Sequence, residues 1–292
     1  MKKDLNYVPP GAIIELPRLP TSVKALDEKL NGGQLQGRTM LVQNQTKREE
    51  MAQEKKLIFP IGFLWPIINE GLPNGSNISL IGPPGVGKTI FCENLANDFL
   101  RKGGNCIYVT LDKAPNDVKN DFKQLTTALS ENEYKKRLVF VDGFGWLIGK
   151  SQEEYHIENL ANLTELSIRI AGAACNLTGP ILLIFDSISP LPVYNPENVV
   201  VKFLQLLLAR IKDWKGIGIY VVQEGVHSDE FCNTLGYLVD GIFDMKMNEE
   251  KGKISRHFRI RSLKFTSHET KWIPFVILAN RKFKLKKRRE VE

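Results

Sequence analysis

The sequence predicts an α/β fold in which helices cover both faces of a mainly parallel sheet. Short, continuously apolar runs alternate with amphipathic stretches between residues 75 and 223. Strands that are apolar throughout are typical of parallel sheets buried on both sides. A glycine-rich turn follows the first of these strands and precedes the first helix. After residue 240 the pattern changes to the alternation that is typical of antiparallel strands.

Five apolar runs are expected to form the parallel strands. They span residues 77–82, 105–112, 137–143, 181–186 and 216–223. Residues 240–265 are expected to form an antiparallel meander that turns near residues 249–252. This meander should extend the sheet at one edge.

The stretches between the runs have helical signals. The first helix follows the glycine-rich turn and should end at Gly103 and Gly104, because glycine favours helix C-termini. A second is expected over residues 162–176, where Asn162 and Glu165 have the spacing of a capping box. A third places apolar side chains three and four residues apart, which is the period of a helix face; these are Val200, Phe203, Leu204, Leu207, Leu208 and Ile211.

The composition is that of a globular protein rather than a disordered or membrane-spanning one. Of the 292 residues, 42% are hydrophobic and 25% are charged. No apolar run approaches the roughly 20 residues that a membrane-spanning helix needs, and the N-terminus lacks a secretion signal. We therefore expect a cytoplasmic protein. The four cysteines form no CxxC pair, so the sequence indicates neither a zinc site nor a disulfide framework.

The net charge of +7 is concentrated at the C-terminus. The last twelve residues carry seven Lys or Arg and two Glu. Such a basic tail is either a solvated surface element or a source of salt-sensitive phosphate contacts.

Residues 26–42 also resemble residues 64–80 at an offset of 38 residues, by chance or as the remnant of a second module.

The glycine-rich turn matches the pattern G-x-x-x-x-G-K-[ST] of a phosphate-binding loop (P-loop). It consists of Gly82, Pro83, Pro84, Gly85, Val86, Gly87, Lys88 and Thr89. The glycines let consecutive backbone amides turn toward the phosphates at the positive end of the next helix. Lys88 should neutralise phosphate oxygens, and Thr89 should offer its hydroxyl to Mg²⁺. We therefore expect ATP and Mg²⁺ to bind here.

Two later strands end in polar residues at the edge where the loop is expected. Asp186 closes the run 181–186 and is the candidate for holding Mg²⁺ through its water shell, although an aspartate there is also a common turn starter. Gln223 closes the run 216–223. Its amide is a candidate sensor of the γ-phosphate, the alternative being a local hydrogen bond.

These motifs, with "CIYVTLDKAPNDV", "VFVDGFGW", "LLIFDSISPL" and "LVDGIFDMKM", resemble those of RecA-superfamily ATPases of the KaiC/RadA type. The chain is most similar to archaeal KaiC-like proteins and RadA paralogues. The resemblance implies a RecA-like ATP-binding domain over residues 59–280, preceded by an extension, 1–58, and followed by the basic tail, 281–292. It also implies a homo-oligomer with ATP at the subunit interface.

The chain departs from that family at two places important for hydrolysis. Asp112 and Lys113 stand where many relatives have two adjacent glutamates that activate water. The shorter Asp112 reaches less far, and we expect Lys113 to lower the basicity nearby. Relatives also carry a Lys-x-Arg-Gly segment that reaches a neighbour's γ-phosphate; here Ser262 replaces the lysine and Lys264 the arginine. Asp112, Gln223 and Lys264 are thus the catalytic candidates, in an ATPase expected to bind tightly and hydrolyse slowly.

Two biological roles fit these expectations. The first is an accessory in DNA recombination or repair that contacts single-stranded DNA or a recombinase, as a RadA paralogue would. Its support is the basic tail together with Arg256, Arg259 and Arg261, but no platform of exposed aromatic residues accompanies them. The alternative is a nucleotide-controlled scaffold or signalling ATPase that does not bind DNA.

Overall fold

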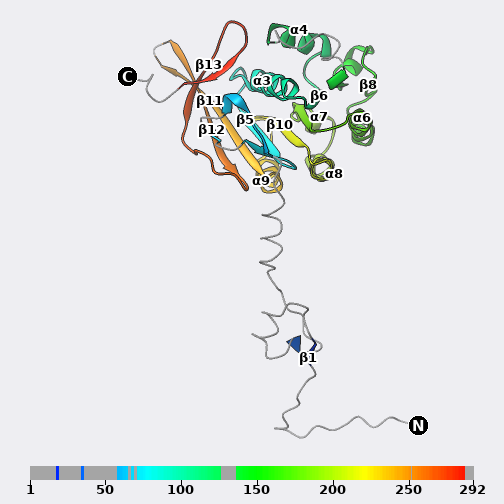
Figure 1. Cartoon of the computed structure of the whole chain (residues 1–292). Coiled ribbons are helices and arrows are strands. Elements are labelled where there is room, and N and C mark those ends of the chain that lie inside the picture. The colour runs from blue at the N-terminus through cyan, green and yellow to red at the C-terminus, as the bar shows by residue number, and fades with distance from the viewer. Residues whose placement is uncertain are drawn as a thin grey trace, which may run out of the picture. The chain divides into compact units, whose positions relative to one another are not determined.

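The computed structural model describes residues 18–19, 34–35, 58–64, 67–68, 71–125, 136–250 and 252–286. The chain divides into two units, residues 1–55 and 56–292 (Figure 1). In the first unit, β1 (Arg18–Leu19) pairs antiparallel with β2 (Gln34–Leu35). The rest of the expected extension up to residue 57, including most of the repeat-like residues 26–42, lies outside the described residues.

The second unit is built on a ten-stranded sheet of order β14-β13-β12-β11-β5-β10-β9-β6-β7-β8. All five expected parallel strands are present and pair in parallel with their neighbours. They are β5 (Asn77–Gly82), β6 (Asn105–Thr110), β7 (Leu138–Asp142), β9 (Ile181–Asp186) and β10 (Ile217–Gln223). The short β8 (Tyr155–His156) joins beyond β7. The carboxyl ends of these strands therefore share one edge.

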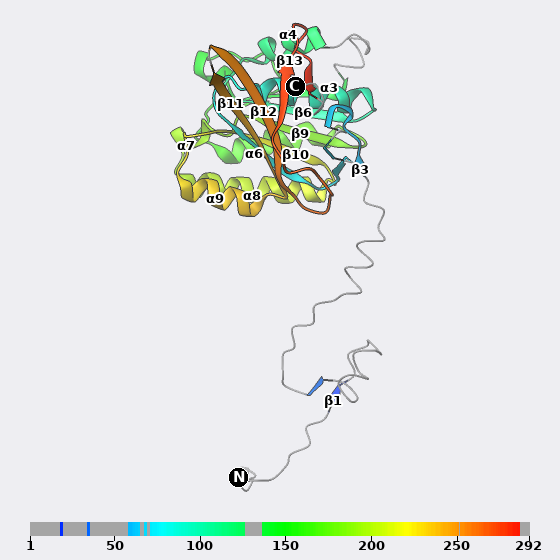
Figure 2. The same ribbon diagram turned by 90° about the vertical axis from the view of Figure 1, so that its left-hand side faces the viewer.

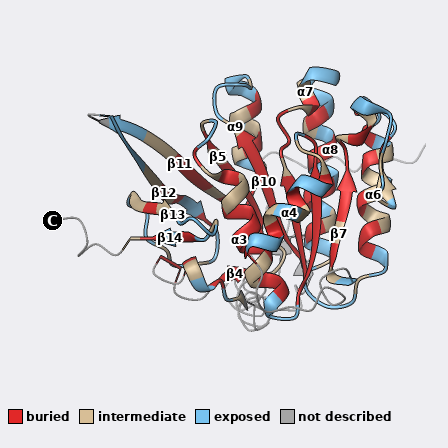
Figure 3. Cartoon of the chain, turned by 90° about the horizontal axis from the view of Figure 1, so that it is seen from above, coloured by how far each residue is buried: buried red, intermediate tan, exposed pale blue. Residues whose placement is uncertain are grey.

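Helices lie on both faces of the sheet, as expected (Figure 3). One face packs against η1 (Gly62–Leu64), α3 (Lys88–Arg101) and α4 (Pro115–Leu125), and the other against α6 (Leu163–Cys175), α8 (Glu197–Asp213) and α9 (Asp229–Leu238). Strand residues alternate between the two cores: Tyr108 packs on the α3 side and Val109 on the opposite side. The predicted cap of α6 is confirmed, because Asn162 accepts a hydrogen bond from the Glu165 amide at 3.0 Å.

The C-terminal strands form the expected antiparallel extension (Figure 2). β11 (Gly241–Glu250) runs parallel to β5 and forms a hairpin with β12 (Lys253–Leu263). β13 (Ile273–Ile277) and β14 (Phe283–Leu285) follow in antiparallel order. Phe283 and Leu285 are buried, so the first part of the basic tail belongs to the folded sheet.

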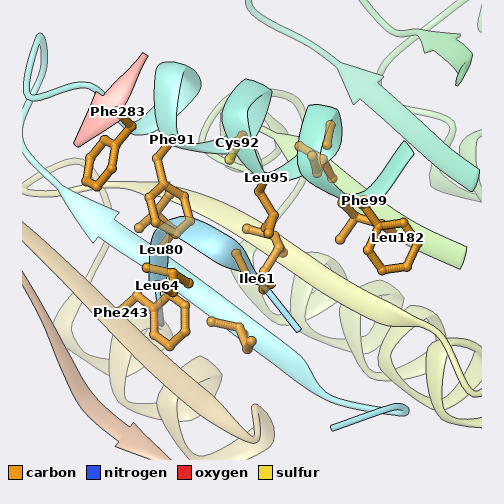
Figure 4. Packing of buried hydrophobic residues seen from close by; sticks show 14 of the residues in the cluster. Ile61, Leu64, Leu80, Phe91, Cys92, Leu95, Phe99, Leu182, Phe243 and Phe283 are labelled. Carbon is orange, nitrogen blue, oxygen red and sulfur yellow. The ribbon is translucent and has the colours of Figure 1, made fainter. Parts of the chain in front are cut away.

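The helix that follows the glycine-rich loop is firmly anchored on the sheet. Phe91, Leu95 and Phe99 of α3 are buried and point toward the strands beneath them (Figure 4). Phe91 makes an edge-on contact with Phe283 of β14, with ring centroids 5.4 Å apart. Burying each such side chain stabilises the fold by about 1.5–3 kcal/mol. α3 thus presents the loop from a rigid platform.

The remaining short elements are β3 (Ile58–Phe59), which pairs with β4 (Leu72–Pro73), and η2 (Gly145–Ile148) and α7 (Leu191–Tyr194), which follow β7 and β9. Within the described part of the chain, no helix combines the length and the apolar character that crossing a bilayer requires.

Candidate nucleotide-binding site

The glycine-rich loop turns sharply between β5 and α3. Gly85 and Gly87 have φ angles of 72° and 113°, in the left-handed region that favours glycine. A Cβ atom on Gly87 would also lie 2.8 Å from Cδ1 of Ile277. Pro84 and Gly85 are exposed, while Val86 is buried beneath them. The loop path therefore needs glycine at these positions, and the top of the loop faces solvent.

Lys88 is folded back into the loop. Its ammonium donates to the carbonyl oxygens of Gly82 at 2.7 Å and Pro83 at 2.8 Å, and to Oε1 of Gln223 at 3.0 Å. Burial lowers the pKa of Lys88, while the nearby Asp186 carboxylate acts in the opposite direction. All three acceptors are neutral, so an anion placed in the loop would offer this buried cation a stronger partner.

Gln223 brings a free hydrogen-bond donor to the same place. Its Nε2 atom is buried and has no hydrogen-bond partner within the described ranges. An unpaired buried amide costs free energy unless a ligand or water satisfies it. Because Oε1 of this side chain holds Lys88, the unpaired nitrogen lies beside the loop. The arrangement fits a phosphate oxygen as the missing acceptor.

A carboxylate and a hydroxyl meet beside the loop at the end of β9. Burial raises the pKa of Asp186, and hydrogen bonds from the side chains of Tyr108 and Thr89 lower it. The Tyr108 hydroxyl donates to Oδ2 of Asp186 at 2.7 Å. Hard oxygen donors of this kind are the ligands that Mg²⁺ uses next to phosphates. Thr89 and Asp186 therefore fit the metal site expected for them.

Asp112 lies at the end of the neighbouring strand. Thr110 pairs with Asp186 in the β6–β9 register, and the Ser187 hydroxyl donates to Oδ2 of Asp112 at 2.6 Å. Asp112 remains exposed to solvent, yet the surrounding protein raises the pKa of its carboxyl, with the hydrogen bonds from Ser187 opposing that shift. A carboxylate is thus available near the loop.

The expected effect of Lys113 on Asp112 is not what the structure shows. The Lys113 ammonium forms an ion pair with Asp121 of α4. Lys88 is the cation that lowers the pKa of Asp112, whereas Lys113 lowers that of Glu93. Lys113 is therefore directed away from Asp112. Lys113 still lacks the second carboxylate that relatives carry, but its positive charge does not lie beside Asp112.

Sequence reasoning missed the polar residues that hold this edge together. The Ser189 hydroxyl accepts the backbone N–H of Gln223 at 2.9 Å and lies 3.0 Å from Nε2 of His227. The amide of Ser189 in turn donates to Oγ of Ser187 at 3.4 Å. The run "DSIS" at the end of β9 was the available signal, since serine side chains often hydrogen-bond to nearby backbone groups.

Lys264 is not at this edge. Gly241 pairs with Ile78, near the amino end of β5, and Leu263 pairs with Gly241. The Lys264 ammonium donates to the carbonyl oxygen of Val239 at 3.0 Å and lies 3.5 Å from the Asp240 carboxylate. The phosphate-binding loop is at the other end of β5. Within one chain, Lys264 is thus separated from the other candidate residues.

Two of the three arginines of the C-terminal hairpin share one carboxylate within the chain. Nε of Arg259 donates to Asp244 at 2.7 Å, and Arg261 donates to the same carboxylate at 2.6 and 2.8 Å. The Arg259 guanidinium also lies 4.4 Å from the ring centroid of Trp272. The side chains of Arg259 and Arg261 lie on the same face of β12, as the strand alternation predicts. Both are already paired with the buried Asp244 of β11.

Comparisons with known proteins agree with this geometry. The family model described as "ATPase: KaiC" matches residues 61–287. A UPF0273 protein of Pyrococcus horikoshii is 29% identical over 215 residues, covering 72% of this chain and 86% of the relative. A UPF0273 protein of Methanopyrus kandleri is 28% identical, covering 72% of this chain and 84% of the relative.

A solved structure has the same fold. The crystal structure of a KaiC-like protein from Pyrococcus horikoshii superimposes with a TM-score of 0.61, covering 80% of this chain and 99% of that one. The sequence identity is 18%, so this likeness concerns the fold. The expected RecA-superfamily, KaiC-like architecture is confirmed.

Proposed function

Because the chain belongs to the KaiC family of ATPases, we propose that it binds ATP with Mg²⁺ at the loop 82–89 and hydrolyses it slowly. The observation that carries this proposal is the contact between Lys88 and Gln223. A buried cation with neutral partners and a buried amide donor without one lie side by side. Both requirements are met by the terminal phosphate of a nucleotide.

Each site residue has a distinct role in this proposal. The backbone amides of the loop and Lys88 hold the β- and γ-phosphates. Thr89 and Asp186 hold Mg²⁺, which supplies charge neutralisation between the phosphate oxygens when it is bound. Tyr108 keeps Asp186 oriented through its 2.7 Å hydrogen bond. Gln223 donates from Nε2 to the γ-phosphate and so distinguishes ATP from ADP.

Slow hydrolysis follows from the short reach of Asp112, the carboxylate that we expect to activate a water molecule. Asp112 is one methylene shorter than glutamate, and Ser187 already occupies one of its oxygens. A displacement of about 1 Å at a reacting group can reduce a rate by about 100-fold. Lys264 lacks the planar, bidentate group with which an arginine stabilises the transition state. Both features favour nucleotide occupancy over turnover.

A turnover assay tests this proposal directly. Purified full-length protein should hydrolyse ATP well below the typical enzyme rate of about 10 per second. The residual rate should be lost in Lys88→Ala, which removes the phosphate-binding cation. Fast, Lys88-dependent hydrolysis, at about one per second or more, would contradict the slow-hydrolysis part of the proposal. ATP binding that is unchanged in Lys88→Ala would contradict the site itself.

We also propose that a second copy completes the site. Lys264 can approach a γ-phosphate only if that nucleotide is bound to a neighbouring subunit, because it lies at the opposite end of β5 from its own loop. Mixing Lys88→Ala with Lys264→Ala tests this. Some mixed interfaces combine an intact loop with an intact Lys264, so the mixture should hydrolyse ATP faster than either variant alone. No recovery in a mixture that sedimentation shows to be assembled would contradict it.

For the biological role, we favour a nucleotide-controlled scaffold over an accessory in DNA recombination or repair. Arg259 and Arg261 share the Asp244 carboxylate, and Arg281 is bound to Glu93 and Asp121, so these guanidinium groups already have carboxylate partners within the chain. The DNA prediction then depends on Arg256 and on the rest of the basic tail, of which residues 287–292 lie outside the described residues. Salt-sensitive binding of single-stranded DNA that requires residues 287–292 would favour the DNA role instead.

A further inference from the structure

Four charged side chains form a cluster behind the nucleotide site. They are Glu93 of α3, Lys113 after β6, Asp121 of α4 and Arg281 in the β13–β14 turn. Arg281 binds Glu93 with distances of 2.8 and 3.0 Å and lies 3.1 Å from Asp121. Asp121 also pairs with Lys113. Two acidic and two basic side chains therefore meet in this cluster.

Arg281 is held in place independently of its charge. Its carbonyl oxygen accepts from Nδ2 of Asn94 at 2.9 Å, and Oδ1 of Asn94 accepts the amide of Phe283 at 3.1 Å. Its φ angle of 60° lies in the left-handed region, which a non-glycine residue adopts only when its surroundings impose it. The hairpin is therefore docked on α3, and Arg281 provides a fixed cation for Asp121.

Asp121 in turn decides where the Lys113 ammonium lies. Lys113 directly follows Asp112, and its backbone is held by the Thr110 hydroxyl, which donates to the Lys113 carbonyl oxygen at 2.6 Å. The Lys113 side chain is partly exposed, at 38%, so packing alone does not confine it. An ammonium on a flexible stem next to Asp112 would otherwise be free to pair with that carboxylate or with phosphate oxygens.

We propose that Asp121 is a positioning residue that keeps the Lys113 ammonium out of the nucleotide site, so that the Asp112 carboxylate, hydrogen-bonded to Ser187, forms no ion pair with Lys113. Arg281, bound to the buried Glu93, orients Asp121 for this task. Released Lys113 would form an ion pair with Asp112 and withdraw its oxygens from the attacking water. The inference rests on the proposed ATP site, because it concerns the carboxylate that serves that site.

A purely structural ion cluster is the competing explanation, and a suppression experiment separates the two. Asp121→Asn removes the charge that holds Lys113 but changes little in shape. Lys113→Met removes the ammonium and keeps an apolar stem. If Asp121 acts by restraining Lys113, then Lys113→Met should cancel the effect of Asp121→Asn. A structural role predicts no such cancellation.

The measurement is single-turnover hydrolysis of MgATP by the full-length chain and by the two single variants and the double variant. We expect Asp121→Asn to hydrolyse about tenfold more slowly or worse, because a positioned base contributes about 100-fold or more. Lys113→Met and the double variant should both stay within about threefold of the unmodified chain. MgATP affinity should not fall in Asp121→Asn, since the ammonium moves toward the phosphates.

Three results would overturn the inference. In the first, the double variant is as slow as Asp121→Asn. In the second, Asp121→Asn hydrolyses at the normal rate. In the third, Asp121→Asn does not fold while Lys113→Met does, which would make Asp121 structural. Failure of the proposed function is distinguished by Lys88→Ala: if that variant binds MgATP as well as the unmodified chain, the site itself is wrong.

Discussion

The ammonium of Lys88 donates a 3.0 Å hydrogen bond to the side-chain oxygen of Gln223, which links the phosphate-binding loop to the end of β10. The backbone of Gln223 is held in turn by the Ser189 hydroxyl at 2.9 Å. His227, in the following loop, contacts the same hydroxyl at 3.0 Å. Hydrogen bonds and contacts therefore connect the Lys88 ammonium, through Gln223 and Ser189, to His227 in the loop before α9.

Replacing Gln223 with alanine should weaken ATP binding but not ADP binding. The unpaired Nε2 donor is expected to bind the γ-phosphate, and a hydrogen bond to a charged group contributes about 1.5–3 kcal/mol, or roughly tenfold or more in affinity. Gln205, exposed on α8, provides the matched control, Gln205→Ala. Titration with both nucleotides measures the ratio. An equal loss of ATP and ADP affinity in Gln223→Ala would exclude the proposed discrimination.

Lengthening Asp112 should accelerate hydrolysis. Asp112→Glu restores the missing methylene, and we expect a gain of about tenfold or more, with Asp112→Asn below the unmodified chain. Because the surrounding protein partly desolvates the exposed Asp112 carboxyl and so raises its pKa, hydrolysis should decrease on acidification at a higher pH than an ordinary aspartate would give. Single-turnover rates between pH 5 and 8 measure both effects. A slower Asp112→Glu variant would show that the carboxylate position is already suitable.

The loop glycines should differ in their tolerance of alanine. Gly85 and Gly87 both have positive φ angles, so each alanine costs about 1–2 kcal/mol of backbone strain. A Cβ on Gly87 would also lie 2.8 Å from Cδ1 at the far end of the Ile277 side chain, which would have to shift, whereas a Cβ on Gly85 meets none of the described atoms within 4 Å. Urea unfolding should show a larger loss for Gly87→Ala. Equal losses would contradict the importance of the Ile277 contact.

Glu93 should make the fold more stable in mild acid. Its burial raises its pKa from 4.5 to about 7, with the hydrogen bond from Arg281 opposing the shift. The folded state then binds the Glu93 proton more tightly than the unfolded state does. The stability that Glu93 adds to the folded state is therefore fully present below pH 4.5 and is lost as the pH rises through 7. The free energy of unfolding relative to Glu93→Gln should fall by up to about 3 kcal/mol between pH 4 and 8. A difference that does not vary with pH would contradict the shift.

Much of the fold and the centre of the site could be predicted from the sequence because they depend on local patterns. The loop residues 82–89 are consecutive in the chain, and continuous apolar runs mark the strands that end at Asp186 and Gln223. Parallel strands bring such ends to one edge whatever the details of packing. The C-terminal hairpin could also be predicted from the sequence, because its turn lies between two segments in which apolar and polar residues alternate.

What could not be predicted depends on contacts between distant segments. The direction of the Lys113 side chain is set by its ion pair with Asp121 on α4. The narrow apolar stripe of α4 is only a weak helix signal in the sequence. The sequence places Arg281 in a basic tail, because its partner Glu93 lies 188 positions away along the chain. The pairing of Arg259 with Asp244 could have been predicted, because counting back along both strands from the pair Glu250 and Lys253 places them opposite each other.

Calorimetric titration of the full-length protein with MgATP, beside Lys88→Ala, tests the central claim most directly. The account predicts saturable binding of one nucleotide per chain to the unmodified protein, and at least about a tenfold loss of affinity when the loop cation is removed. Omitting Mg²⁺ should weaken binding to the unmodified chain as well. A well-folded protein that takes up no adenine nucleotide, or one whose affinity is the same with and without Lys88, would contradict it.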